Sequence, residues 1–533
     1  MSKTSFAADV ASVQVGGTAP PVKTPQAFWA PWVLPSIADV FFLVLLGLLG
    51  FSPMSKALLV DADTGWHIRN GEIILATRSV PHVDSFSYTR AGQPWYAWEW
   101  LYDALIGAIH HFAGLNGVVL FTALVIAVTF ALLFRFVLRR SGSFAIAVLL
   151  TLLAVAAAQV HMFARPHVLS WLFTLLWVEA LYRFEEGRRA ALFCLPGLML
   201  LWVNVHGGFI LGLMLIALFG CAHVWNYQTT RDAVHRRQIV ELAIAFGACL
   251  SVTFLTPYGY KLHLHVYQYL SNGFLMNSIG EFQSPDFHAA GFGYFECLIL
   301  LSIAALAMAL KRVTATDLFL LLFSIHAGLF AARNIPISAV IMSLALGPPL
   351  ASVLSPGPGQ PRWTRSLLDC VHDISENLVG MEKRFRGHAL AIIVLVSSSA
   401  IALNGGRLLS AQVLSAHFDE KRFPVKAAEF IAARGIHDHL FNLDKWSGYL
   451  IYRLYPGTKL YMDDRHDFYG EAFIKEGMQV SNVTWRWREP LDKYQVRWVL
   501  IDTNSPLASV LKEDKAWHVQ YDDGLAIIFS RIL

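Results

Sequence analysis

The sequence contains eleven apolar runs, and each is close to the length that crosses a lipid bilayer. A helix needs about 20 apolar residues to span the hydrocarbon core. The runs lie near residues 36-53, 117-138, 143-160, 167-184, 190-205, 208-226, 238-256, 292-310, 316-331, 335-350 and 388-404. Hydrophobic residues make up 55% of the chain and charged residues 15%, with a mean hydropathy of +0.48, which excludes an ordinary soluble globular protein. We therefore predict a polytopic α-helical membrane protein with about eleven transmembrane helices.

Basic residues predict how the chain threads the membrane. They cluster at every second boundary between apolar runs, at Arg139-Arg140, Arg188-Arg189, Arg231 with Arg236-Arg237, Lys311-Arg312 and the stretch from Arg362 to Arg386. Under the positive-inside rule, this spacing puts the N-terminal tail, residues 1-35, in the cytoplasm and the C-terminus outside. The net charge of +4 is small for 533 residues, so nucleic acid is not an expected partner.

One further apolar stretch, residues 98-113, is assigned to the membrane surface instead of its interior. It contains Glu99, Asp103, His110 and His111, which suit an interfacial helix on the outer face. Counting this stretch as a span would move the basic clusters to the wrong side of the membrane. We therefore expect an outer first loop with a helix lying on the bilayer surface.

This threading divides the chain into a membrane part and an outer part. Residues 36-404 form the transmembrane domain, whose first outer loop covers 54-116, and residues 405-533 form an extracytoplasmic α/β domain. In that domain Pro424 precedes an expected helix, and strands are expected at HLFNLD, TKLYMDD, VRWVLIDT and GLAIIFSRI. It contains neither a GxGxxG nor a P-loop motif, so the sequence does not support a nucleotide site there.

Acidic residues mark the first outer loop. Asp61 and Asp63 stand in DADTGWHIRNGEIIL, which predicts an amphipathic helix. Carboxylates at the outer end of a membrane span can bind a divalent cation or act as a general base, but aspartates also cap helices. Glu99 lies between Trp98 and Trp100, where indole rings can raise its pKa or stack on a sugar; an ordinary aromatic belt is the alternative.

Polar residues also mark the other outer segments. Arg165 and His167 in ARPH can hold a phosphate, although an arginine at this depth can also snorkel to the interface. Asn204 and His206 lie at the tip of a tight hairpin, where they either bind a ligand or bond to one another across helices. Further candidates are Lys261 and Glu281 in loop 257-291 and Arg333 in the turn AARN.

No metal-ligand set is assigned. His263 and His265 are two residues apart, so a helix puts them on different faces, and no third ligand follows at a recognised spacing. The five cysteines imply no disulfide framework. In the outer domain, MDDRHDFYG (462-470) concentrates acidic and basic side chains after an expected strand. This segment either binds a ligand or forms a salt-bridged loop that docks on the membrane part.

These features resemble the class C glycosyltransferase superfamily, which includes protein O-mannosyltransferases, the aminoarabinose transferases acting on lipid A, and oligosaccharyltransferases. The matching segments are DADTGWHIRNGEIIL, VPHVDSFSYT, WEWLYDALIGAIHHFAGLNG and LLFRFVLRRSGSF, within residues 36 to 260. The resemblance implies transfer of a sugar from a polyprenyl-phosphate carrier to an extracytoplasmic acceptor, which is a glycan, a lipid or a protein. It implies no required cofactor, and a divalent cation is compatible with the aspartate pair.

The resemblance also implies roles for individual residues. An acidic residue of the first outer loop would be the general base, with Asp63 the best match and Asp61 and Glu99 assisting. The residues expected to hold the departing phosphate are Arg165, His167 and Arg333. The Asp-Glu pair typical of the mannosyltransferases is Asp-x-Asp here, and Glu99 stands where several relatives have a proline pair. The acceptor class therefore does not carry over.

A closer resemblance runs along most of the chain. The strings DADTGWHI, VPHVDSFSYT, WYAWEWL, ARPHVLS, WVNVHGGF and TPYGY are similar to uncharacterised bacterial glycosyltransferase-like membrane proteins. This similarity implies a multi-pass protein of the bacterial inner (plasma) membrane. Two other functions compete with sugar transfer. A transporter or flippase of lipid-linked substrates predicts charges at mid-membrane depth and inverted repeats. A non-catalytic envelope assembly factor predicts that Asp63→Asn leaves the phenotype intact.

Overall fold

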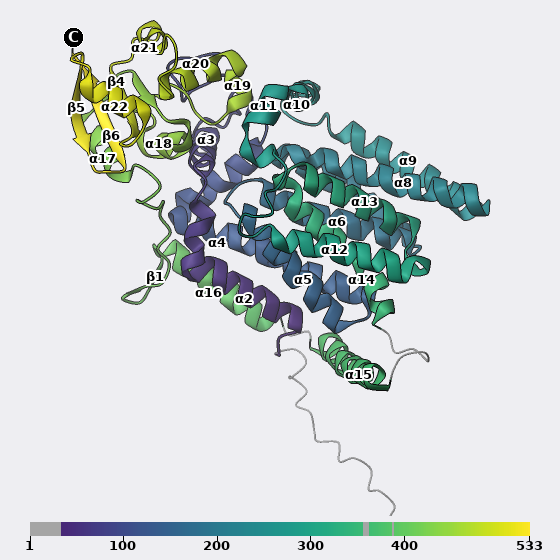
Figure 1. Cartoon of the computed structure of the whole chain (residues 1–533). Coiled ribbons are helices and arrows are strands. Elements are labelled where there is room, and N and C mark those ends of the chain that lie inside the picture. The colour runs from purple at the N-terminus through teal and green to yellow at the C-terminus, as the bar shows by residue number, and fades with distance from the viewer. Residues whose placement is uncertain (1–33, 355–361, 386–387, 533) are drawn as a thin grey trace, which may run out of the picture.

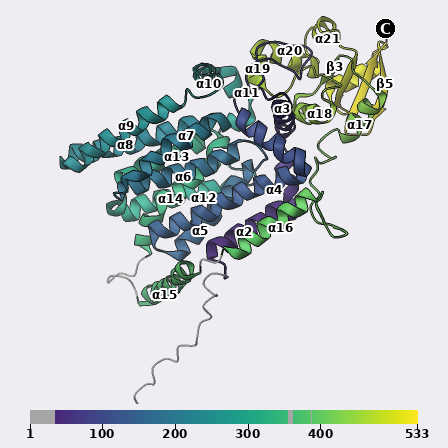
Figure 2. The same cartoon turned by 180° about the vertical axis from the view of Figure 1, so that it is seen from behind.

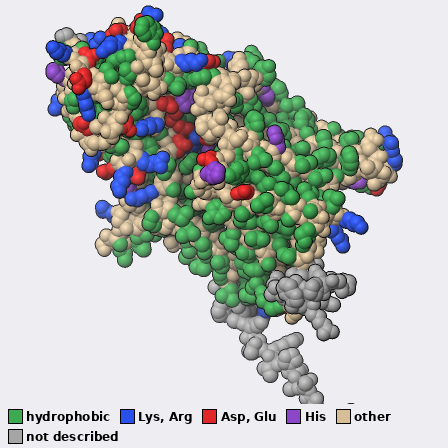
Figure 3. All heavy atoms as spheres, viewed as in Figure 1, with side chains coloured by type: hydrophobic (Ala, Val, Ile, Leu, Met, Phe, Trp, Pro, Cys, Tyr) green, Lys and Arg blue, Asp and Glu red, His purple; other side chains and the backbone are tan. Residues whose placement is uncertain are grey.

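The computed structural model describes residues 34–354, 362–385 and 388–532. It has a large helical lobe and a smaller C-terminal lobe that contains a β-sheet, and the two lobes meet at the first outer loop (Figures 1 and 2). The predicted cytoplasmic tail falls outside the described residues, apart from its last two. Hydrophobic side chains cover most of the visible surface of the helical lobe, whereas charged side chains concentrate on the C-terminal lobe (Figure 3).

Each of the eleven apolar runs coincides with a helix. These helices are α2 (Ile37–Phe51), α4 (Trp100–Ser141), α5 (Phe144–Ala158), α6 (His167–Glu185), α7 (Cys194–Val205), α8 (Ile210–Thr230), α9 (Ala233–Val252), α12 (Gly293–Ala309), α13 (Ala315–Phe330), α14 (Ile335–Val353) and α16 (Ala389–Leu403). Among the described residues, five helices are long and apolar enough to cross a membrane, or up to seven if each bent pair counts as one span. The protein is thus a multi-pass helical membrane protein, and the count of eleven spans stays a prediction.

Helix α4 combines the predicted interfacial helix with the following span. It has 42 residues, about 63 Å at 1.5 Å per residue, which is roughly twice the thickness of a bilayer core. Its backbone leaves the helical region at Gly114, where φ is 58° and ψ is −157°, a conformation that glycine adopts without a Cβ clash. The break separates the first part of α4, which was predicted to lie on the membrane surface, from the apolar run 117-138.

Glycines bring helix α3 (Asp63–Thr77) of the first outer loop into close contact with both lobes. A Cβ on Gly71 would overlap the carbonyl group of Asp103 in the first part of α4. A Cβ on Gly65 would overlap the carbonyl group of Gly448 in helix α18 (Ser447–Leu454) of the C-terminal lobe. Only residues without a side chain allow such close approach, so α3 is fixed between the two lobes.

The C-terminal lobe contains a four-stranded sheet in the order β3-β4-β6-β5. Strand β3 (Leu440–Asn442) is parallel to β4 (Trp498–Asp502), and β6 (Ala526–Arg531) is antiparallel to both β4 and β5 (Trp517–Asp522). The remaining elements are β1 (Arg407–Leu408), β2 (Ala411–Gln412), α17 (Val425–Arg434), α19 (His466–Tyr469), α20 (Glu471–Ser481), α21 (Arg488–Lys493) and α22 (Pro506–Glu513). The helix expected after Pro424 is confirmed as α17, and three of the four expected strands are present.

The prediction of a strand at TKLYMDD was wrong. Leu460 makes only isolated bridges, to Ser87 and to Leu440. Its N–H donates to the carbonyl of Phe86 and its carbonyl accepts from the N–H of Tyr88, both at 3.1 Å. The segment therefore bonds to the first outer loop and pairs with the sheet only through the single bridge to Leu440 of β3. Strand β5 was not expected, although its sequence WHVQYD alternates apolar and polar residues as a half-buried strand does.

The remaining elements belong mainly to the helical lobe. The 3-10 helices are η1 (Pro53–Leu59), η2 (Gln159–His161), η3 (Arg189–Phe193), η4 (Gly207–Phe209), η5 (Gly280–Phe282), η6 (Leu310–Arg312) and η7 (Ala332–Asn334), while η8 (Asp444–Trp446) lies in the C-terminal lobe. Helices α10 (Lys261–Ser271) and α11 (Gly273–Ser278) lie beside the C-terminal lobe, and α15 (Arg362–Arg384) lies at the far end of the helical lobe (Figure 1). From α15, the Glu382 carboxylate accepts the N–H of Ile37 at 2.7 Å and thereby fixes the start of α2.

Candidate functional site

The aspartates of the first outer loop lie at the start of α3. The N-cap position is Ala62, which makes no side-chain cap. Asp61 Oδ1 accepts the N–H of Asp63 at 3.0 Å, so one aspartate supports the helix start. The carboxylate of Asp63 does not cap α3, which leaves it available for contacts outside the helix.

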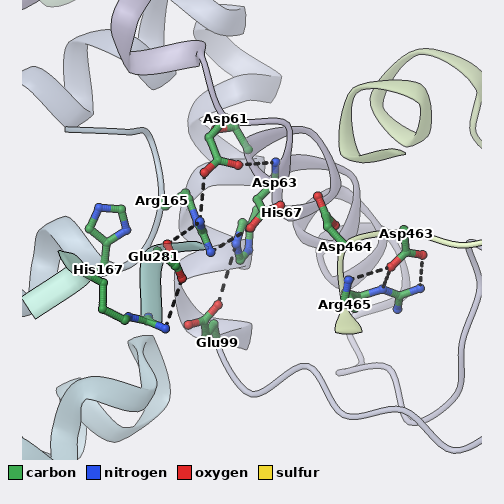
Figure 4. Close-up of polar contacts among 12 residues, drawn as sticks. Asp61, Asp63, His67, Glu99, Arg165, His167, Glu281, Asp463, Asp464 and Arg465 are labelled. Atoms are coloured by element: carbon green, nitrogen blue, oxygen red, sulfur yellow. Dashed lines mark hydrogen bonds and ion pairs between the residues drawn. The ribbon is translucent and has the colours of Figure 1, made fainter. Parts of the chain in front are cut away.

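Arg165 joins the two aspartates. Its Nη1 lies 2.9 Å from Asp61 Oδ2, and its Nη2 lies 2.8 Å from Asp63 Oδ2 (Figure 4). The turn that carries Arg165 is fixed to α3, because the hydroxyl of Thr64 donates to the carbonyl of Ala164 at 3.0 Å. Burial disfavours the guanidinium charge, but the surrounding carboxylates raise the pKa of Arg165 well above its usual value. The arginine therefore stays charged between the two aspartates.

A second arginine lies behind this group. Glu281 is 3.7 Å from Arg165 Nη1 and 3.2 Å from Arg333 Nη1, so it links the two guanidinium groups. Arg333 also lies over the ring of Phe282, 4.6 Å from its centroid. Burial raises the pKa of Glu281, but Arg333 and then Arg165 outweigh burial and lower it to about 2. Glu281 is therefore ionised at all physiological pH values.

The C-terminal lobe contributes Asp464 to the opposite side of Asp63. The two carboxyl groups lie side by side in Figure 4, and each of them shifts the pKa of the other. Next to it, the buried Arg465 donates to Asp463 at 2.7 Å and to Asp84 of the first outer loop at 2.6 Å. The segment MDDRHDFYG thus docks on the first outer loop through Arg465 and also brings a carboxyl group to Asp63.

Glu99 lies on a third side of the site, between two imidazole rings. Its carboxylate oxygens are 3.8 Å from His67 Nε2 and 3.7 Å from His206 Nε2. His67 comes from α3, one turn after Asp63, and its Nδ1 is 2.6 Å from the buried Asp103. Burial is the main cause that raises the pKa of Glu99, to about 7. At neutral pH this carboxyl group can therefore either take up or release a proton.

These contacts surround an opening between the two lobes. Figure 3 shows acidic side chains in the hollow where the C-terminal lobe meets the helical lobe. The side chains of Asp61, Asp63 and Arg165 are 19%, 16% and 21% exposed, so solvent and a ligand can reach them. The arrangement combines a carboxylate held by an arginine, a carboxyl group that titrates near pH 7 and a second arginine. It can accept a proton and stabilise an anion.

Comparison with known proteins identifies the fold that contains this site. No family model matches the chain, and no curated protein matches it in sequence. Among solved structures, it resembles the oligosaccharyltransferase of Archaeoglobus fulgidus in its apo form, with a TM-score of 0.54, 12% identity, and coverage of 87% of this chain and 69% of the other. It also resembles AglB from the same organism in complex with an inhibitory peptide and a dolichol-phosphate, with a TM-score of 0.54, 11% identity, and coverage of 92% and 73%. The chain has a class C glycosyltransferase fold. At this level of identity the likeness establishes the fold alone.

Most of the site residues expected from the sequence meet in this class C fold. Asp61, Asp63 and Arg165 are in direct contact, and Arg333 is joined to Arg165 through Glu281. Glu99 and His206 lie together beside His67.

Three expected residues face elsewhere. The Nε2 of His167 is 2.8 Å from the carbonyl of His161, and its buried ring lies apart from Asp63 (Figure 4). Asn204 accepts a hydrogen bond from the indole of Trp100 at 2.8 Å and donates to two backbone carbonyls, so its amide is used within the protein. Lys261 is exposed, with its Nζ 5.4 Å from the ring centroid of Tyr96.

Two residues of the site were missed by the sequence analysis. His67 follows Asp63 by four residues, a spacing that puts both on one face of a helix, so this signal was available. Asp103 lay in the predicted interfacial helix, and only the contact between α3 and α4 reveals that it holds His67 and accepts from Asn70 at 2.6 Å.

The aspartate pair does not form a metal cluster. Among the described residues, no group of three or more His, Cys, Asp or Glu side chains could hold a metal ion. The guanidinium of Arg165 lies between Asp61 and Asp63, where a bridging cation would need to bind. A divalent cation would therefore have to displace this arginine.

Proposed function

We propose that this protein is a membrane glycosyltransferase that moves a sugar from a polyprenyl-phosphate carrier to an extracytoplasmic acceptor. The observation that carries the proposal is the position of Asp63 in a class C fold. It is held by Arg165 at 2.8 Å at the start of the first outer-loop helix, where the two lobes meet. The AglB structure with a dolichol-phosphate and an inhibitory peptide supports a lipid-linked donor and an outer acceptor for this fold.

In the proposed reaction Asp63 is the general base. An acceptor hydroxyl attacks the anomeric carbon of the sugar, and its proton passes to the Asp63 carboxylate. The bond between the anomeric carbon and the phosphate oxygen breaks, and the carrier phosphate leaves with the electron pair. Burial raises the pKa of Asp63, while Arg165 opposes this effect, so its carboxylate is a stronger base than that of an exposed aspartate.

Two arginines are suited to the departing phosphate. Arg165 is adjacent to Asp63, and its Nε is a buried donor with no hydrogen-bond partner among the described residues. Arg333 lies one residue further from Asp63, behind Glu281. Guanidinium groups bind phosphate oxygens with two parallel hydrogen bonds. We leave His167 out of this group, because its ring is committed to a backbone carbonyl.

The same proposal includes the cellular setting. The N-terminus would be cytoplasmic, and the C-terminal lobe would lie in the periplasm or outside the cell, with the helical lobe in a bacterial inner membrane. The ion pairs of Arg139 and Arg140 at the last turn of α4 agree with a cytoplasmic end there. Because the charged groups described above gather at helix ends, they favour an enzyme over a transporter with mid-membrane charges.

The proposal is tested with the full chain reconstituted in lipid vesicles. Radiolabelled polyprenyl-phosphate sugars are added together with a membrane extract that contains the acceptor. We expect transfer by the natural protein, a loss of about 10²- to 10⁴-fold in Asp63→Asn, and a smaller loss in Asp61→Asn. The matched control is Asp492→Asn, a carboxylate that is 57% exposed on the C-terminal lobe.

Two outcomes would contradict the proposal. Transfer that survives both Asp63→Asn and Asp61→Asn would remove the first-loop base. An absence of transfer from every donor tested would favour an assembly factor, since such a protein needs no reaction at Asp63.

A further inference from the structure

The C-terminal lobe holds Asp464 against the first outer loop by a close crossing of two helices. The N–H of Asp464 donates to the hydroxyl of Ser447 at 3.2 Å, and Ser447 is the first residue of α18. In the next position, a Cβ on Gly448 would overlap the carbonyl group of Ala62, immediately before Asp63. The same helix therefore fixes Asp464 and packs against the start of α3. The carboxyl pair, Asp63 and Asp464, is set by this crossing.

The carboxyl pair requires a proton. Two ionised carboxylates can only accept hydrogen bonds, and they repel each other, so the neighbouring Asp63 and Asp464 can form a hydrogen bond only when one of them is protonated. Arg165 binds Asp63, and none of the ion pairs of the described residues includes Asp464. In addition, Asp464 Oδ1 is buried without a hydrogen-bond partner there. An ionised Asp464 would thus have a buried carboxylate oxygen without a partner, so the proton belongs on Asp464.

The charged groups around the carboxyl pair agree with a proton on Asp464 and a negative charge on Asp63. On the helical side, Asp63 faces Arg165, Asp61 and His67. On the side of the C-terminal lobe, Asp464 faces Asp463 and Asp444. The two basic residues that follow Asp464 in the sequence are committed to other carboxylates: Arg465 to Asp463 and Asp84, and His466 to Asp444 at 2.9 Å. Burial, followed by the charge of Asp63, raises the pKa of Asp464 well above its usual value.

We propose that Asp464 is a positioning residue that keeps a proton and donates it in a hydrogen bond to Asp63, so that the base is complete only while the C-terminal lobe is docked on the first outer loop. This inference rests on the proposed function of Asp63 as the base. The hydrogen bond orients the Asp63 carboxylate and favours its ionised form. The shared proton is not consumed, because the acceptor's proton goes to Asp63.

The inference gives the two lobes a joint role in the reaction. The buried Arg465 joins Asp84 of the first outer loop to Asp463 of the C-terminal lobe, with all three side chains at most 2% exposed. Breaking an ion pair of this kind is costly, so the lobe stays docked. Undocking would remove Asp464 from Asp63 and leave the base without its hydrogen-bond donor.

The test compares Asp464→Asn with Asp464→Ala in the vesicle assay across a range of pH. Asparagine stays neutral and can donate from its amide to Asp63, whereas alanine cannot donate. We expect Asp464→Asn to transfer sugar within about threefold of the natural protein and to lose the decline at high pH that deprotonation of Asp464 causes. We expect Asp464→Ala to lose at least about 30-fold, with its decline at low pH moved upward by roughly one pH unit.

A purely structural role for Asp464 gives different results. Equal losses in both variants without a change in pH dependence would overturn the proposal, and so would full activity in both. Asp492→Asn is the matched control, and it should leave the rate and the pH profile unchanged. Size-exclusion chromatography of each variant in detergent shows whether the protein is folded. If Asp464→Ala is not folded, the pH profile of Asp464→Asn alone tests the proposal.

A measurement without catalysis separates this inference from the proposed function. Infrared difference spectra of the natural protein minus Asp464→Asn, recorded near neutral pH, should contain the C=O stretching band of a protonated carboxyl group. If no donor supports transfer, the proposed function fails, but this band still decides where the proton lies. A difference spectrum without the band would overturn the shared proton even if the enzyme is active.

Discussion

Two clusters of arginine and carboxylate groups lie at the two ends of α4, and they differ in how completely their charges are paired. In the last turn of α4, Arg140 pairs with Asp317 at 2.9 Å. The Asp317 carboxylate also accepts hydrogen bonds from Tyr182 at 2.6 Å and Thr314 at 2.7 Å. The side chains of Arg140 and Asp317 are only 11% and 3% exposed. Asp317 is thus nearly closed to solvent, and its carboxylate accepts hydrogen bonds from three side chains.

The cluster at the other end of α4 has an excess of acidic groups. Its carboxyl groups belong to Asp61, Asp63, Glu99, Glu281 and Asp464, and its guanidinium groups to Arg165 and Arg333. Burial makes such an excess unfavourable unless some groups hold protons or bind a ligand. The comparison indicates that the paired cluster stabilises the bundle, whereas the acidic cluster is arranged for proton transfer.

The largest difference is expected when the arginine of each cluster is replaced. In Arg165→Gln, Asp61 and Asp63 lose their common partner, so we expect sugar transfer to fall by at least about 100-fold. In Arg140→Gln, a buried Asp317 is left unpaired, which should lower the free energy of unfolding by about 3 kcal/mol. Transfer per folded molecule should remain within about twofold of the natural rate. The vesicle assay and thermal unfolding in detergent measure the two effects.

These two variants can also refute the comparison. Equal losses of specific activity would mean that both clusters serve only to hold the fold. A loss confined to Arg140→Gln would move the site to the other end of α4.

The next largest effect is expected at the crossing of α3 and α18. In Gly448→Ala, the added methyl group would overlap the backbone at Ala62, so the C-terminal lobe must shift away from Asp63. We expect transfer to fall by about tenfold while the circular dichroism spectrum keeps its helical signal. The control is Gly247→Ala in α9, where a Cβ would meet nothing within 4 Å. Equal activity of the two alanine variants would show that the lobe does not need this close docking.

The acidic cluster also predicts an effect of pH on stability through Glu99. Its pKa is raised from 4.5 to about 7 in the folded protein, mainly by burial. Between these values the folded state binds more protons than the unfolded state, so stability is full below about pH 4.5 and falls as the pH rises through 7. The side chain is 23% exposed, so the loss is at most roughly 3 kcal/mol.

Glu99→Gln tests this dependence, because glutamine cannot ionise. The unfolding temperature of the variant should change less between pH 5 and pH 8 than that of the natural protein. Glu281 gives the contrasting case, since its pKa is lowered to about 2 and its stabilising contribution is lost only as the pH falls through that value. An unchanged pH dependence in Glu99→Gln would assign the titration to another group.

Local patterns in the sequence predicted most of the helices and much of the site. Apolar runs located eleven helices of the helical lobe, and the acidic start of DADTGWHIRNGEIIL located α3 with Asp61 and Asp63. Arg165 was recognised as a candidate because the positive-inside rule makes an arginine in an outer turn unusual. These predictions succeeded because each depends on residues that are close together in the chain.

The failures depend on contacts between distant residues. Residues 458-464 contain a strand-like pattern, but the backbone of Leu460 bonds to residues 86 and 88 of the first outer loop, which no local pattern reveals. The pairing of Asp464 with Asp63 has the same origin, because it follows from the crossing at Gly65 and Gly448. Composition and spacing indicate which residues are polar, but only the packing of the lobes determines which of them meet.

The smallest effect is expected at Lys261, which the sequence nominated and the fold separates from the acidic cluster. Its side chain is exposed over Tyr96, and none of the ion pairs of the described residues joins it to Asp63, Glu99 or Glu281. An exposed lysine over an aromatic ring contributes about 0.5–1 kcal/mol, so Lys261→Gln should change transfer by less than about twofold. Comparing the transfer rates of Lys261→Gln and Arg165→Gln distinguishes an arginine that binds the catalytic base from a lysine that only lies on the same side of the protein. A tenfold loss would mean that the lysine reaches the substrate, and the site would then extend along α10.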